Sequence, residues 1–209
     1  MGKRTIRRVL RPPATMNGDP WLQHWLPLVH ERAGGLPVLE LGCGSGEDTA
    51  TLVRAGHQVI AIDLSQSSIA AAKAKAPSAE HYCQDIRSPF PKRATGVGVI
   101  VASLSLHYFE WPETLALVER VRQTLRPGGV FLCRLNSTND HNYGASGHPR
   151  IADNYFSVHG EPKRFFDRQS IHAIFARGWS ALAEEELVIH KYAHPKSVWE
   201  VVVERDAEP

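Results

Sequence analysis

The 209-residue chain contains only three cysteines and no long run of apolar residues. A membrane-spanning helix needs about 20 consecutive apolar residues, and no stretch approaches that length. No N-terminal signal peptide is visible either. Cys43, Cys83 and Cys133 each lie in or beside an apolar run, which predicts reduced thiols packed in the core. We therefore expect a soluble, cytoplasmic protein with no membrane partner.

Potential metal ligands do not gather in the sequence. The eleven histidines are scattered, and no pair of them has the spacing of a zinc site. No internal repeat or low-complexity segment occurs. We therefore expect no bound metal, and a chain of this length can bury a substantial core as one domain without such cross-links.

Acidic residues are missing from the N-terminal end. Five lysines and arginines precede the first acidic residue, Asp19, although the net charge of the whole chain is only +2. Residues 1–18 are therefore predicted to form a basic, flexible arm. Such an arm can bind RNA electrostatically, but it has no interleaved aromatic residues, which favours a solvated tail.

Strand-like and helix-like segments alternate along most of the chain. Strands that alternate with helices pair in parallel through right-handed crossovers, so an α/β fold is expected. The last two strands are predicted to form an antiparallel hairpin at the edge of the sheet. The sequence predicts helices at 19–33, 47–55, 66–76, 113–125 and 167–176, and strands at 37–41, 58–62, 79–84, 97–102, 129–135, 186–192 and 197–204.

The segment 136–160 has a different composition. It carries Asn, Asp, His, Gly and Ser with little periodicity. Long polar segments of this kind are commonly functional loops. We expect residues 137–165 to form a loop or lid beside a site.

Three alternating glycines interrupt the first strand-like run, in Glu40-Leu-Gly-Cys-Gly-Ser-Gly46. This pattern predicts a strand, a tight turn and the start of a helix, where glycine lets a ligand approach the main chain. Asp63 ends the second run 17 residues after Gly46, close to the spacing at which a carboxylate meets a ribose diol. Asp85 ends the third run. These strand ends predict a site for a nucleotide-like molecule.

Together these motifs resemble those of the class I S-adenosylmethionine-dependent methyltransferases. The resemblance covers residues 36–136 and includes the segment 97–107 and Leu125-Arg-Pro-Gly-Gly129. A dehydrogenase more often has a G-x-G-x-x-G turn, whereas Glu47 would repel a pyrophosphate at this helix N-terminus. The resemblance implies a Rossmann-like three-layer sandwich, with a seven-stranded, mostly parallel sheet ending in an antiparallel hairpin, as a single methyltransferase domain over 19–209.

The resemblance also implies S-adenosyl-L-methionine as cofactor. Asp63 would accept hydrogen bonds from the ribose hydroxyls, with capping of the next helix as its alternative role. Asp85 would meet the adenine, unless it only forms a turn. Glu40 and the glycine loop would face the methionine portion. The cofactor-binding residues expected are Glu40, Gly42, Cys43, Gly44, Gly46, Asp63, Leu64, Asp85, Ile86, Ala102, Ser103 and Leu104.

The acceptor side is expected after the fourth and fifth strands. His107 is a candidate general base; alternatively, its ring only forms a hydrogen bond to the neighbouring loop. Tyr143 is a second candidate catalytic residue. Asn136 and Arg164 are candidate substrate ligands, although Arg164 also reads as a solvated cation.

We expect the acceptor to be a small molecule. The segment 161–166 before Gly178-Trp179 is distantly similar to tellurite- and thiopurine-type methyltransferases. An RNA or protein methyltransferase is an alternative, but no Asn-Pro-Pro-Tyr-type motif follows the fourth strand. A non-catalytic regulator that binds S-adenosylmethionine would share every cofactor residue and stays a second alternative.

Overall fold

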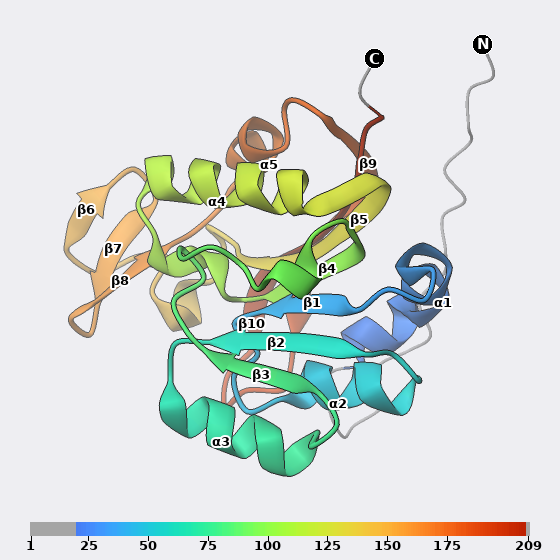
Figure 1. The fold of residues 1–209 in the computed structure, drawn as a ribbon. Helices are drawn as coiled ribbons and strands as arrows, with labels where there is room; N and C mark the ends of the chain where they lie inside the picture. The colour runs from blue at the N-terminus through green and yellow to red at the C-terminus, as the bar shows by residue number, and fades with distance from the viewer. Residues whose placement is uncertain (1–19, 208–209) are drawn as a thin grey trace.

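A central β-sheet with helices on both faces forms the body of the protein (Figure 1). The computed structural model describes residues 20–207, so the predicted basic arm at 1–18 lies outside the described residues. The sheet has seven strands in the order β3-β2-β1-β4-β5-β10-β9. Its strands are β1 (Val38–Leu41), β2 (Val59–Asp63), β3 (Glu80–Cys83), β4 (Val97–Ser103), β5 (Leu125–Asn136), β9 (Trp179–Ile189) and β10 (Lys196–Arg205).

The pairing confirms the predicted fold class. Strands β1 to β5 pair in parallel, whereas β10 is antiparallel to both β5 and β9. The C-terminal hairpin is therefore present, and its second strand, β10, lies between β5 and β9 rather than at the edge.

Alternate residues of the buried strands supply two separate cores, because successive side chains of a strand point to opposite faces. One core joins the sheet to α1 (Trp21–Ala33), α2 (Glu47–Arg54) and α3 (Gln66–Lys75). The other joins it to α4 (Trp111–Thr124) and α5 (Arg168–Ile174). Figure 1 shows these helices as layers below and above the sheet.

Local sequence signals account for the helix starts. The Ser65 hydroxyl accepts a hydrogen bond from the Ser68 amide at 3.2 Å, which caps α3 as predicted. Pro112 lies in the first turn of α4, where a missing amide proton costs nothing. Helix α1 continues through Pro27.

A buried polar network fastens α1 to the sheet. Glu200 on β10 accepts hydrogen bonds from Arg134 Nε at 3.0 Å and from Trp25 Nε1 at 2.8 Å. Arg134 and Glu200 are each only 1% exposed. At the start of α1, Trp21 Nε1 donates to both carboxylate oxygens of Asp48 in α2. The amino end of α1 therefore lies beside the first turn of α2, which follows the glycine loop.

The prediction of three core cysteines was wrong for one of them. Cys43 and Cys133 are buried, but Cys83 is exposed. It ends β3, which is an edge strand and has no fully buried residue. The apolar run that ends at Cys83 therefore does not indicate a buried strand.

The segment 136–160 is not the long loop that its composition predicts. It contains the 3₁₀ helix η3 (His141–Tyr143) and two strands, β6 (Arg150–Ala152) and β7 (Tyr155–Val158), which join β8 (Glu161–Arg164) in an antiparallel sheet. These strands are three or four residues long, too short for alternation to be recognised. Asn154 and His159 turn the chain between them with positive φ values. In Figure 1 this small sheet projects beyond the start of α4.

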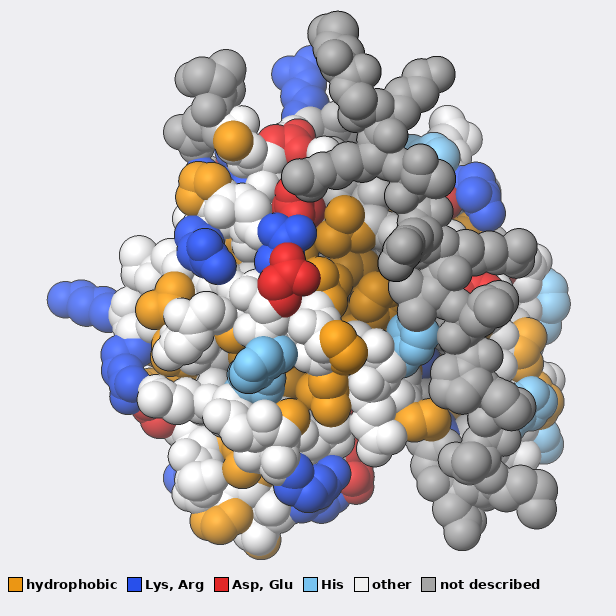
Figure 2. Space-filling view, turned by 90° about the vertical axis from the view of Figure 1, so that its right-hand side faces the viewer, with side chains coloured by type: hydrophobic (Ala, Val, Ile, Leu, Met, Phe, Trp, Pro, Cys, Tyr) orange, Lys and Arg blue, Asp and Glu red, His pale blue; other side chains and the backbone are white. Residues whose placement is uncertain are grey.

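The features of two other function classes are absent from residues 20–207. No helix there is long and apolar enough to cross a membrane. No group of three or more His, Cys, Asp or Glu side chains is placed to hold a metal ion. On the face shown in Figure 2, acidic and basic side chains are interspersed with apolar ones.

Candidate functional site

The glycine loop joins the carboxyl end of β1 to α2. The amides of Gly42 and Cys43 both donate to the carbonyl of Ile62 on β2, at 2.8 and 2.9 Å. The Gly46 amide donates to the Cys43 carbonyl at 2.9 Å, which closes the turn. These bonds hold the loop against the end of β2.

All three glycines of the loop have positive φ, but for two different reasons. A Cβ on Gly42 would lie 2.3 Å from Ser105 Cβ, and one on Gly46 would lie 2.8 Å from Ala72 Cα. Those two positions need glycine for packing. At Gly44 nothing lies within 4 Å of the missing Cβ, so the middle of the loop faces open space that a ligand can enter.

Asp63 connects this loop to the next helix. One carboxylate oxygen accepts from the Gly44 amide at 2.8 Å and the other from the Ser65 amide at 2.9 Å. The alternative role, capping of the next helix, falls to Ser65, whereas Asp63 supports the turn that leads into that helix. A carboxylate has about four acceptor positions, so the two oxygens can still receive ribose hydroxyls. The ribose contact stays a prediction.

Glu40 is a buried acid without a cation beside it. Its side chain is 3% exposed and accepts a hydrogen bond from Thr49 Oγ1 at 2.6 Å. No residue within 20–207 forms an ion pair with it. Burial raises the pKa of Glu40, and the charges of Asp48 and Asp63 raise it further. A cationic ligand would remove this cost, which fits the ammonium group of a methionine moiety.

Cys43 lies in the loop but is not a nucleophile. Burial, with the charges of Glu40 and Asp63, raises the pKa of its thiol to about 12. The thiolate is the reactive form, so this side chain packs as a small apolar group.

The predicted adenine region combines an exposed apolar residue with an aspartate that is already hydrogen-bonded to an arginine. Leu64 is 69% exposed, and Ile86 is buried. Asp85 accepts from the Arg87 amide at 2.8 Å and from Arg87 Nη2 at 2.7 Å, which lowers the pKa of Asp85. Arg87 Nη1 also donates to Glu113. Asp85 is therefore already engaged, and its adenine contact would have to be shared with Arg87.

The end of β4 has a strained backbone. Leu104, a residue with a large side chain, has a φ of 56°, and its amide donates to the Arg134 carbonyl at 2.9 Å. Positive φ at such a residue costs of order 1–3 kcal/mol and is found most often at functional sites. Ala102 is fully buried and Ser103 half-buried. The predicted methionine contacts thus include one strained position.

His107 does not have the properties of a general base near neutral pH. It lies in the 3₁₀ helix η2 (Leu106–Tyr108) and is 5% exposed. Burial, together with the charges of Lys163 and Lys196, lowers its pKa to about 3. At neutral pH the ring is uncharged and weakly basic, so it can form hydrogen bonds but has little power to remove a proton. Its buried Nδ1 has no hydrogen-bond partner among residues 20–207.

Two other predicted acceptor residues support the structure around this point. The Tyr143 hydroxyl bonds to both the amide and the carbonyl of His194, each at 3.1 Å. The buried Asn136 side chain donates to the Arg164 carbonyl at 3.4 Å. Beside Tyr143 the structure places two lysines, Lys163 and Lys196, that the sequence did not single out.

Arg164 is buried rather than solvated. Its Nε donates to the Phe109 carbonyl at 3.0 Å, and its Nη1 donates to the Asp153 carbonyl at 3.3 Å. The guanidinium lies over the rings of Tyr155 and Trp111. Burial lowers the pKa of Arg164.

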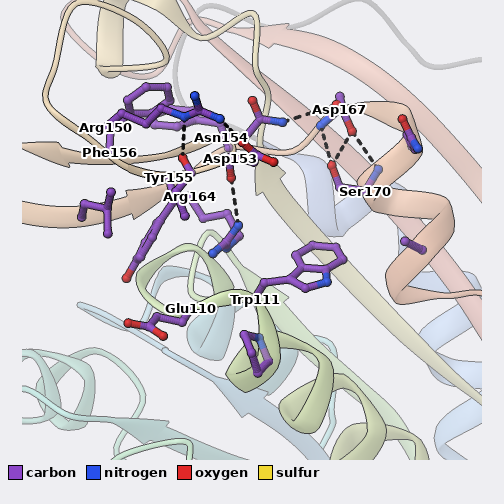
Figure 3. A pocket seen from close by; sticks show the side chains of 16 residues that line it. Glu110, Trp111, Arg150, Asp153, Asn154, Tyr155, Phe156, Arg164, Asp167 and Ser170 are labelled. Atoms are coloured by element: carbon purple, nitrogen blue, oxygen red, sulfur yellow. Dashed lines mark hydrogen bonds and ion pairs between the residues drawn. The ribbon is translucent and has the colours of Figure 1, made fainter.

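Arg164 lines a cavity of about 930 Å³ between the start of α4, the β6–β8 sheet and α5. Figure 3 shows the guanidinium reaching into it from β8. The lining includes no residue of the glycine loop, and neither Asp63 nor His107. The structure therefore does not bring Arg164 together with the predicted cofactor residues around one cavity.

Comparison with known proteins gives the context of this geometry. Residues 38–129 match a family model described as a methyltransferase domain. An uncharacterized methyltransferase of Synechocystis is 31% identical over 120 residues, which cover 56% of this chain and 56% of that protein. A ubiquinone biosynthesis O-methyltransferase of Bradyrhizobium diazoefficiens is 52% identical over 103 residues, 47% of this chain and 39% of that protein. The chain thus spans about half, or less, of these relatives.

Solved structures extend the likeness to most of the chain. A methyltransferase from Methanosarcina mazei, described as S-adenosylmethionine-dependent, superposes with a TM-score of 0.73 at 17% identity. The match covers 87% of this chain and 98% of that one. At this identity the likeness establishes the fold.

The family match covers β1 to the start of β5, and the fold match covers 87% of the chain. The resemblance predicted from the sequence is therefore confirmed: residues 38–129 match a methyltransferase domain, and the chain has the Rossmann-like fold of the class I S-adenosylmethionine-dependent methyltransferases.

Proposed function

We propose that this protein transfers a methyl group from S-adenosylmethionine to a small-molecule acceptor. The observation that carries the proposal is the glycine loop, held to Asp63 and open to a ligand at Gly44. Glu40, which is buried without a cation, precedes this loop in β1, and the exposed Leu64 directly follows Asp63.

The residues present fit the cofactor. Glu40 would hold its ammonium group, Asp63 its ribose hydroxyls, and Leu64 with Ile86 its adenine ring. When bound, S-adenosylmethionine supplies a methyl group on a positively charged sulfur, which is already a strong electrophile. The protein then has to orient the acceptor and exclude water, and such positioning can contribute up to about 7–11 kcal/mol.

A small acceptor is favoured by two observations. The relative from Bradyrhizobium is named for ubiquinone biosynthesis, a small-molecule pathway. On the one face drawn in Figure 2, Lys and Arg side chains lie among Asp and Glu and do not form the continuous basic patch that nucleic-acid binding uses.

Turnover with labelled S-adenosylmethionine tests the proposal. Purified protein is offered a pool of small metabolites and, separately, a pool of RNA. The proposal predicts label in the small-molecule pool. Label only in RNA would support the alternative acceptor class, and binding of the cofactor without transfer to any pool would indicate a regulator.

The segment 137–165 is proposed to cover the acceptor. The three residues of strand β6 are all exposed, so they have few contacts to hold them. We expect their amides to exchange rapidly in the free protein and to gain protection when S-adenosylhomocysteine and an acceptor from the screen bind together. Hydrogen exchange measures this, and full protection of the segment in the free protein would exclude a lid.

A further inference from the structure

Five residues from distant parts of the chain meet beyond the carboxyl end of β4. This lysine cluster consists of His107, Asp140, Tyr143, Lys163 and Lys196. Strand β8 packs against η2, and η3 packs against the start of β10. The cluster is therefore held by backbone elements rather than by one mobile loop.

The cluster lies close to the predicted cofactor edge. Tyr108, the neighbour of His107, is 53% exposed. Apart from burial, the charges of Asp63 and Glu161 raise the pKa of Tyr108. In the chain η2 directly follows β4, whose end is part of the predicted cofactor edge, and η2 packs against β8, which carries Lys163.

Only one of the two lysines has a carboxylate partner. Lys196 Nζ donates to Asp140 Oδ2 at 2.6 Å, and both side chains are buried. Lys163 Nζ donates to the Tyr143 carbonyl at 3.0 Å, and no acidic side chain of residues 20–207 pairs with it. The cluster therefore carries one uncompensated positive charge.

Holding that charge in a half-buried place is costly unless an anion comes to it. Burial and the charge of Lys196 lower the pKa of Lys163, although nearby Asp140 opposes this. Lys163 Nζ also lies 5.9 Å from the centre of the Tyr143 ring and 5.9 Å from that of Phe165. Aromatic faces stabilise an ammonium weakly and leave its N–H donors free.

His107 adds an unused hydrogen-bonding atom to the same place. Its ring is 5% exposed, and Nδ1 has no partner within the described part of the chain. Buried polar atoms are nearly always satisfied, so an unpartnered one beside a free charge indicates a place for a bound group.

We infer that the methyl acceptor is a small carboxylic acid, whose carboxylate is bound by Lys163 and His107 in the lysine cluster. This rests on the proposed function, because it assigns the substrate class of that same site. One uncompensated ammonium matches one negative charge. A phosphate dianion usually requires more donors, such as arginine or a helix N-terminus.

A carboxylate acceptor also agrees with the low basicity of His107. The carboxylate oxygen bonds to the methyl carbon as the sulfur–carbon bond breaks, and that electron pair stays on sulfur. The carboxylate becomes a neutral ester, the sulfonium becomes a neutral thioether, and no proton has to be removed. Lys163 would hold the carboxylate, and His107 would orient it.

The test compares acids with matched neutral compounds. A panel of mono-, di- and tricarboxylic acids, their primary amides and a set of phosphate monoesters is offered with labelled S-adenosylmethionine. Binding is measured separately as the rise in melting temperature of protein saturated with S-adenosylhomocysteine. We expect the rate of methylation to be at least tenfold higher for the acids than for the amides. The acids should also raise the melting temperature at concentrations at least tenfold lower than the amides require.

Variants locate the effect. Lys163→Gln should raise KM for the acids at least tenfold and abolish their effect on melting temperature. Lys163→Arg should retain part of both. The exposed Lys92→Gln serves as the control and should match the wild type.

The possible results separate the inference from the proposed function. Four results would each overturn the inference: equal methylation of acids and amides, a preference for phosphate esters, an unchanged KM in Lys163→Gln, or no transfer to acids by protein that binds S-adenosylhomocysteine. Failure to bind S-adenosylhomocysteine would overturn the proposed function itself.

Discussion

Replacing Glu200 with alanine is expected to lower the free energy of unfolding by about 3–5 kcal/mol, because it breaks a buried ion pair with Arg134. Glu200 accepts from Arg134 and from Trp25 Nε1, and both ionic side chains are 1% exposed. Domains are commonly stable by only about 5–15 kcal/mol, so this is a large fraction of the total.

Urea unfolding measures the loss as a lower midpoint with an unchanged slope. Glu119→Ala is the matched control, because Glu119 pairs with Arg122 at the surface and such pairs contribute about 0–1 kcal/mol. If Glu200→Ala does not fold, Glu200→Gln should still be less stable than the wild type, since it keeps an acceptor but loses the charge. A Glu200→Gln variant as stable as the wild type would contradict this account of the network.

Asp63→Ala is expected to weaken binding of S-adenosylhomocysteine by about 1.5–3 kcal/mol, roughly 10- to 150-fold, because the ribose hydroxyls lose a charged acceptor. The side chain also accepts from the amides of Gly44 and Ser65, so the loop loses part of its support. Asp63→Asn keeps one acceptor oxygen and should lie between the wild type and Asp63→Ala.

Calorimetry and a thermal melt together separate the two roles of Asp63. Glu31→Ala, an exposed acid on α1, is the control and should bind as the wild type does. If the affinity of Asp63→Ala is unchanged while its melting temperature falls steeply, Asp63 only supports the loop and turn around it, and its assignment to the cofactor is wrong.

The sheet was predictable because its signals are local. The apolar run before Gly42 and the run that ends at Asp63 are buried parallel strands, which read as near-continuous hydrophobic segments. Helix α3 begins after Ser65, and the glycine loop has the left-handed backbone that its sequence requires. Fold and loop geometry therefore followed from residues close together in the chain.

The acceptor side was less predictable because it depends on contacts between distant segments. Strands β6 to β8 are too short to show a period, and Cys83 is exposed because β3 is an edge strand. Lys163 and Lys196 are 33 residues apart in the sequence, and nothing local to either indicates that they meet at Tyr143. Burial is the main cause of the low pKa of His107, and the charges of these two lysines lower it further.

Titration calorimetry of the wild-type protein with S-adenosylhomocysteine, S-adenosylmethionine and NAD tests whether the glycine loop and Asp63 bind S-adenosylmethionine. Glu40, the glycine loop and Asp63 are expected to bind the two methionine-derived ligands, and Glu47 at the start of α2 disfavours a pyrophosphate. We expect S-adenosylhomocysteine and S-adenosylmethionine to bind, and NAD not to displace them. Tight binding of NAD with no binding of S-adenosylmethionine would contradict it.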